Sequence, residues 1–160
     1  MTFVYANKDL ITAVLAGNSR QVISALRKGA NANARYRGRT LLLWAIQAGH
    51  LNVVKTLVHA GASLEKKDNE GCTPLDQAVG ENNLKVVKFL IEAGANVNGC
   101  CSNGRPLHTA SAWRRPKIVK ILLAHGANPN ARDKDGRKPV EFTKPSSNQI
   151  DKAICELLKI

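Results

Sequence analysis

Aromatic residues, cysteines and long apolar runs are all scarce in this 160-residue chain. Aromatic residues make up 4% of it, so a core has to be built from aliphatic side chains. The four cysteines, Cys72, Cys100, Cys101 and Cys155, lack the spacing of a disulfide framework or a zinc knuckle and fit a reducing compartment. No stretch reaches the roughly 18 apolar residues of a membrane span, and the first nine residues lack the features of a secretory leader. We therefore expect a soluble, cytoplasmic protein, with the nucleus or the cytosol of a host cell as alternatives.

Size and composition indicate one globular unit. The hydrophobic fraction of 44% and the charged fraction of 22% are close to the globular averages of about 45–50% and about 25%. A chain of 160 residues falls within the roughly 100–200 residues of an ordinary domain. We expect a single domain over residues 1–160.

Acidic residues are half as frequent as basic ones: 12 Asp and Glu against 24 Lys and Arg give a net charge of +12. Basic and acidic residues number eight and one in residues 1–64, four and six in 65–104, and twelve and five in 105–160. Two basic ends (+7 each) therefore flank a slightly acidic middle (−2). The net charge favours an acidic partner, whereas the acidic interruption counts against a continuous nucleic-acid track.

Internal repetition dominates the sequence. The pair Gly-Ala recurs at residues 29, 61, 94 and 126, which are 32, 33 and 32 residues apart. Three copies continue into Asn-x-Asn, at Asn31–Asn33, Asn96–Asn98 and Asn128–Asn130, and Ser63–Glu65 is a degenerate copy. A repeat of this length is typical of a solenoid.

Each repeat contains two helical patterns. The longer helix carries apolar residues at i, i+1, i+4 and i+5, as at Val86, Val87, Leu90 and Ile91, and its closing glycine is typical of a helix C-terminus. A shorter helix opens upstream with a proline in its first turn in the third and fourth copies. Turn segments that end in glycine precede the shorter helices.

These motifs resemble those of ankyrin repeat proteins. The Thr-Pro-Leu-His block of that family is matched by Thr73–Asp76 and Arg105–His108, and its Gly-Ala-Asn-x-Asn signature is matched at three of four sites. The resemblance implies an all-α solenoid of about five helix-turn-helix repeats, at about residues 2–34, 35–67, 68–100, 101–132 and 133–160. The first and last copies depart from the pattern, so we expect them to act as caps.

The resemblance also implies a function: protein binding, without catalysis, through a concave face formed by the turn tips and the exposed side of the shorter helices. By position, the predicted contact residues are Tyr36, Arg37, Arg39, Gln47, Asn69, Glu70, Glu81, Asn103, Ala112, Trp113 and Arg137. We expect an adaptor that is monomeric when free. The alternative is a nucleic-acid or phosphorylated ligand bound through the basic patches.

Trp113 is the most informative single residue. An exposed tryptophan at a variable position is typical of a binding hot spot. The alternative is that its ring packs against Arg114 and Arg115 or fills a gap between repeats.

No motif points to catalysis, a cofactor or a metal. The histidines, among them His50 and His108, fall on scaffold positions of the repeat, and none is paired with a nucleophile. Cys101 and His108 lack further ligands at metal-site spacing. The sequence therefore predicts a non-enzymatic binding module.

Overall fold

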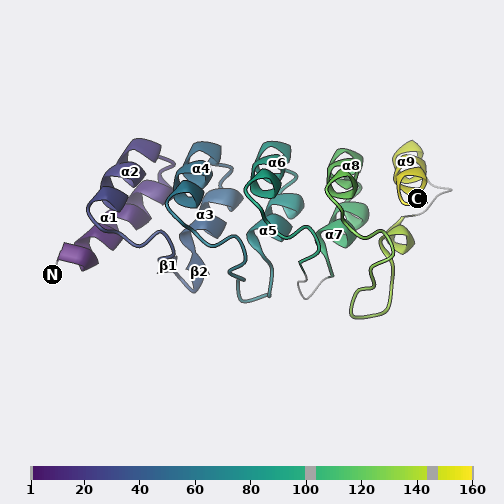
Figure 1. Cartoon of the computed structure of the whole chain (residues 1–160), viewed down its shortest axis with the longest axis horizontal. Coiled ribbons are helices and arrows are strands. Elements are labelled where there is room, and N and C mark those ends of the chain that lie inside the picture. Colours follow the sequence, from purple (N-terminus) through teal and green to yellow (C-terminus); the bar gives the residue numbers. More distant parts are fainter. Residues whose placement is uncertain (1, 100–103, 144–147, 160) are drawn as a thin grey trace.

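Pairs of helices follow one another along the chain and lie side by side in a row (Figure 1). The computed structural model describes residues 2–99, 104–143 and 148–159, and their side chains from residue 6 onward. One layer of the row contains α2 (Ser19–Arg27), α4 (Leu51–His59), α6 (Leu84–Glu92), α8 (Pro116–Ala124) and α9 (Gln149–Leu157). The other contains α1 (Thr2–Leu15), α3 (Leu41–Gln47), α5 (Pro74–Gly80), α7 (Pro106–Ala112) and the 3-10 helix η1 (Pro139–Phe142). The predicted all-α solenoid is confirmed.

A shared aliphatic core joins the repeats. In α6 the predicted stripe of Val86, Val87, Leu90 and Ile91 is buried, and so are the first three matching positions of α4 and α8, whereas Val58 and Leu123 at the fourth position are partly buried. Helices of one layer pack against their neighbours in the same layer, α3 on α5 and α5 on α7, and also against the helix that follows them in the chain. No repeat could bury its apolar face alone, so each depends on the next.

A tight connection with positive φ links the two helices of each full repeat. It is made by Gly17, Gly49, Asn82 and Arg114, with φ between 54° and 72°. Glycine and asparagine tolerate this conformation, whereas an arginine adopts it at a cost. Arg114 is held in place by an ion pair of 3.0 Å between its Nε and an Oδ1 of the buried Asp151 on α9.

The Asn-x-Asn motif links neighbouring repeats through side-chain hydrogen bonds. Within the motif, the Asn96 side chain accepts a hydrogen bond from the Asn98 N–H (2.9 Å). The Asn98 side chain then donates to the Gly126 carbonyl and accepts from the Asn128 N–H, both at 2.9 Å, in the next repeat. Asn33 makes the same two links to Gly61 and Ser63.

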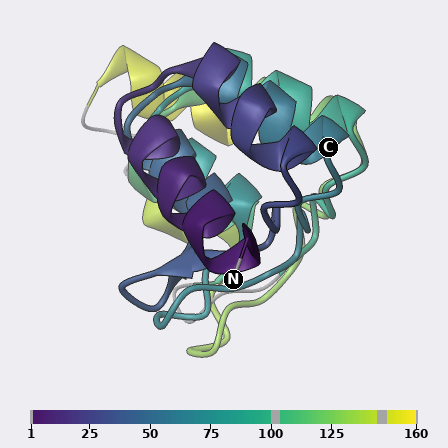
Figure 2. The same cartoon turned by 90° about the vertical axis from the view of Figure 1, so that its left-hand side faces the viewer.

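The turns differ from one repeat to the next. The turn before α3 is a two-residue hairpin between β1 (Arg35–Tyr36) and β2 (Arg39–Thr40), with positive φ at Arg37 and Gly38. Two successive residues of positive φ match the twist of paired strands. Seen along the row, the turn tips lie beyond the helix ends, beside the layer that contains α1 (Figure 2).

The two ends of the array depart from the repeat, as predicted. The first pair begins with the 14-residue α1, twice the length of α3, α5 or α7. In the last pair a short 3-10 helix takes the place of the shorter α-helix, and Ile154 of α9 and Leu158 just after it are buried.

We predict that Asn98→Ala lowers the free energy of unfolding by about 1–2 kcal/mol, because two hydrogen bonds between repeats are lost. Urea denaturation measures the change. Asn52→Ala is the matched control: the side chain is exposed on α4, so we expect a change within about 0.5 kcal/mol. An equal effect of the two substitutions would contradict the role of Asn98.

Candidate functional site

Two adjoining hollows lie on the turn side of the row. The first hollow, of about 350 Å³, is lined by Arg37, Arg39, Gln47, Asp68, Asn69, Glu70 and Gln77. The second hollow, of about 150 Å³, is lined by Asp68, Glu70, Cys72, Asp76, Gln77, Gly80, Thr109 and Trp113. Asp68, Glu70 and Gln77 belong to both, so the two form one groove that runs over the second, third and fourth repeats.

Many of the predicted contact residues meet in this groove. The first hollow brings together Arg37, Arg39, Gln47, Asn69 and Glu70, which come from two different turns and from α3. Trp113 forms a wall of the second hollow.

The other predicted residues lie elsewhere. Glu81 and Ala112 are exposed at the C-terminal ends of α5 and α7 without lining either hollow, and Arg137 lies on the turn before η1. Asn103 lies outside the described residues, as do Cys100 and Cys101.

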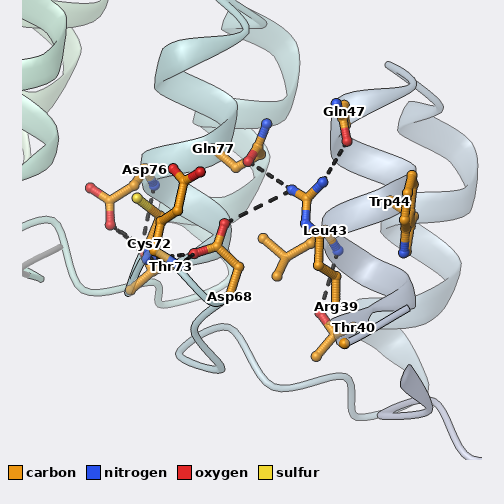
Figure 3. A network of polar contacts seen from close by, with 12 residues as sticks. Arg39, Thr40, Leu43, Trp44, Gln47, Asp68, Cys72, Thr73, Asp76 and Gln77 are labelled. Atoms are coloured by element: carbon orange, nitrogen blue, oxygen red, sulfur yellow. Dashed lines mark hydrogen bonds and ion pairs between the residues drawn. The ribbon is translucent and has the colours of Figure 1, made fainter. Parts of the chain in front are cut away.

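The Arg39 guanidinium spans two repeats inside the first hollow (Figure 3). It donates to Gln47 Oε1 (2.6 Å) on α3 and to Gln77 Oε1 (2.9 Å) on α5, and it lies 4.0 Å from Asp68 Oδ2. It also lies 5.3 Å from the centre of the Trp44 ring, which supports it by a cation–π contact. This arginine is therefore a fixed wall of the groove.

Arg37 lines the first hollow, whereas its neighbour Tyr36 does not. The Tyr36 ring packs on Trp44 with 5.9 Å between ring centres, and the Tyr36 carbonyl accepts a hydrogen bond from the Trp44 indole (2.9 Å). The Arg37 guanidinium lies 5.3 Å from the centre of the Tyr36 ring, and Arg37 is exposed. Arg37 thus presents its positive charge to solvent.

The second hollow contains a buried carboxyl group. Asp76 is 4% exposed, and its Oδ2 accepts hydrogen bonds from the Thr73 N–H (3.0 Å) and hydroxyl (2.8 Å). Its buried Oδ1 has no hydrogen-bond partner among the described residues. Burial raises the pKa of Asp76 from 3.8 to about 6, although the two hydrogen bonds from Thr73 act to lower it.

Trp113 lines the same hollow as this carboxyl group, and 62% of its surface is exposed. That exposure does not fit the alternative in which the ring fills a gap between repeats. Trp113 caps the C-terminal end of α7, next to the strained Arg114, so the backbone that presents the indole is held by the Arg114–Asp151 ion pair.

Comparison with known proteins identifies the family. The family model for ankyrin repeats, three copies, matches residues 10–99 and 63–133. The chain belongs to the ankyrin repeat family. Ankyrin repeats are generally protein–protein interaction modules, and the family is generally non-enzymatic.

A mouse (Mus musculus) protein named 2-5A-dependent ribonuclease is 38% identical to this chain over 76 residues. The match covers 46% of this chain and 10% of that protein, so this ankyrin repeat chain corresponds to a small part of its relative.

The described part of this ankyrin repeat protein contains neither a membrane-spanning helix nor a metal-binding cluster of side chains. Within it, no helix combines the length and apolarity needed to cross a bilayer. The same residues include no cluster of three or more His, Cys, Asp or Glu side chains that could hold a metal ion.

Several residues that line the groove were not singled out from the sequence, among them Asp68, Asp76, Gln77 and Thr109. Asp76 occupies a scaffold position, where the fourth repeat has His108. The longer His108 side chain reaches the next repeat, with Nε2 3.0 Å from the Arg137 carbonyl oxygen. An aspartate at this position of an ankyrin repeat is the signal in the sequence that could have marked the site.

We predict that Asp76→Asn changes how stability depends on pH. The pKa of Asp76 is higher in the folded protein than its ordinary value of 3.8, so its contribution to stability is full below about pH 4 and is lost as the pH rises through about 6. The asparagine variant has no such loss. Its free energy of unfolding relative to wild type should rise by about 1–3 kcal/mol between about pH 4 and pH 7.5.

Urea denaturation of both proteins at the two pH values measures this difference in the free energy of unfolding. All other titrating groups are common to variant and wild type, so their contribution cancels in the difference. A difference that stays constant with pH would show that Asp76 is not buried as described.

Proposed function

We propose that this ankyrin repeat protein acts by binding another protein in its groove, and not by catalysis. The observation that carries the proposal is the 62% exposure of Trp113 beside two adjoining polar hollows. A large, rigid aromatic side chain that is already exposed can bury much area on binding at little entropic cost.

The groove favours a partner segment of mixed charge. Arg37 at one edge is exposed and suits an acidic group of the partner, as the net charge of +12 favours. Asp68, Glu70 and Asp76 lie nearer the centre, where they suit a basic or hydrogen-bond-donating group. The partner would therefore be acidic in part and would lie along the groove from Arg37 to Trp113.

A nucleic-acid or phosphorylated ligand is the second candidate. The net charge and the printed name of the mouse relative, 2-5A-dependent ribonuclease, favour testing it. Two of the three arginines on the second turn are already engaged, since Arg35 donates to the Gly38 carbonyl (2.7 Å) and Arg39 to two glutamines. Carboxylates in the same groove would repel phosphate, which makes protein binding the better-supported function.

We predict that Arg37→Ala with Trp113→Ala abolishes capture of the partner from an extract of the native cell. Both side chains are exposed, so the double variant should keep its fold. The control is Lys88→Ala with Lys120→Ala, which changes two exposed side chains on α6 and α8 of the other layer. Mass spectrometry should identify proteins that wild type and control retain and the groove variant loses. Identical captured sets would contradict the proposal.

Titration with a random-sequence oligonucleotide at two salt concentrations tests the second candidate. Binding through phosphates weakens steeply as salt rises, because counterions are released. We expect no saturable, salt-sensitive binding, and finding it would favour the nucleic-acid function.

A further inference from the structure

The turn before η1 shows how this protein holds a guanidinium group. Asp133 Oδ1 accepts hydrogen bonds from the N–H groups of Asp135 (2.9 Å) and Arg137 (2.8 Å), which fixes the turn. The Arg137 guanidinium then contacts Asp133 Oδ2 (3.0 Å) and Asp135 Oδ2 (2.6 Å), and it lies 4.7 Å from the centre of the Phe142 ring. Two carboxylates and one aromatic face thus surround one guanidinium.

The turn before α5 has the same construction except for one residue. Asp68 Oδ1 accepts hydrogen bonds from the N–H groups of Glu70 and Cys72, both at 2.9 Å, as Asp133 does two repeats later. Asp68 and Glu70 therefore correspond to Asp133 and Asp135. Cys72 corresponds to Arg137, so no arginine stands at this position of the turn, and the Arg39 guanidinium of the preceding repeat lies 4.0 Å from Asp68 Oδ2.

The second hollow lies beside this turn and supplies the remaining elements. Trp113 provides an exposed aromatic wall, as Phe142 does for Arg137. Asp76 adds the buried Oδ1, an acceptor without a hydrogen-bond partner among the described residues. In Figure 3 the other carboxyl oxygen of Asp76 faces Thr73, and Oδ1 points away from it. A buried carboxylate oxygen without a donor is costly and is relieved by a donor that enters the hollow.

We propose that the second hollow binds the guanidinium of an arginine side chain from the partner protein. The proposal rests on the proposed function, since it names the chemistry of one contact within the same groove. The incoming guanidinium takes the place that Arg137 has in its own turn. Its face lies on Trp113, and its N–H groups point toward Asp76, Asp68 and Glu70.

Arginine fits this hollow better than lysine does. Its planar group can stack on an indole and still donate hydrogen bonds from its edge, whereas an ammonium group is a compact, strongly hydrated charge. The protein already holds three of its own guanidinium groups against aromatic rings, Arg37 on Tyr36, Arg39 on Trp44 and Arg137 on Phe142. The hollow has a volume of about 150 Å³, which suits one side-chain end and not a folded domain.

The decisive variant is Cys72→Arg, which places an arginine where Arg137 stands in the fifth repeat. Its guanidinium should fold onto Asp68 and Glu70 and fill the hollow. Cys72→Ser is the matched control, because it changes the same residue and adds no cation. Thermal unfolding should give similar midpoints for the two variants.

The probe is the peptide acetyl-Ala-Ala-Arg-Ala-Ala-amide, titrated into the isotope-labelled full chain and followed by NMR through the backbone amides of Gly80 and Thr109. The same peptide with lysine, or with neutral citrulline, in place of arginine is the comparison. We expect saturable shifts with the arginine peptide for wild type and Cys72→Ser, and binding at least about tenfold weaker for Cys72→Arg. The lysine and citrulline peptides should bind at least about tenfold more weakly than the arginine peptide.

Trp113→Ala, on an exposed position, is the second variant and should weaken binding of the arginine peptide by about tenfold through loss of the cation–π contact. Absence of saturable shifts in wild type, equal binding of citrulline or lysine, or wild-type affinity in Cys72→Arg would each overturn the proposal. The same variants distinguish a failure of the arginine contact from a failure of the proposed protein-binding function. If the Arg37 and Trp113 double variant loses its partner while Cys72→Arg keeps it, the groove binds protein and the arginine contact is wrong.

Discussion

Each repeat of this protein is stable only because a neighbour covers its apolar face. The stripe of α6 is buried between α4 and α8, and no repeat contributes enough aliphatic surface to form a core alone. Asn33 and Asn98 add hydrogen bonds from one repeat to the next, which fixes the register of the stack. The terminal repeats complete the array, with the buried Asp151 of α9 paired to Arg114.

This packing determines where function can lie. Buried and capping positions are committed to the stack, whereas the turns and the exposed ends of α3, α5 and α7 carry side chains that can contact a partner. The groove forms at these positions because neighbouring turns are held side by side. Arg39 illustrates the link between stability and function, since its bonds to Gln47 and Gln77 join two repeats and also shape the first hollow. Opening the stack at this point would therefore also remove the site.

Much of the fold could be predicted from the sequence, because glycine spacing and apolar periodicity depend on local geometry. The positions of Arg37, Asn69 and Trp113 in the groove followed from their places in the repeat. The role of Asp76 did not, because its burial depends on packing between the third and fourth repeats. Likewise, the sequence marks Arg39 as a charged turn residue, but its engagement by Gln77, 38 residues away, depends on the stacked structure.

Amide hydrogen exchange of the chain, alone and with the protein it captures, tests most directly whether the turn-side groove is the binding surface. We predict slower exchange on binding at residues 68–72 and 109–113, with little change in the outer helices α4, α6 and α8. Protection confined to those outer helices, with the groove unchanged, would contradict this prediction.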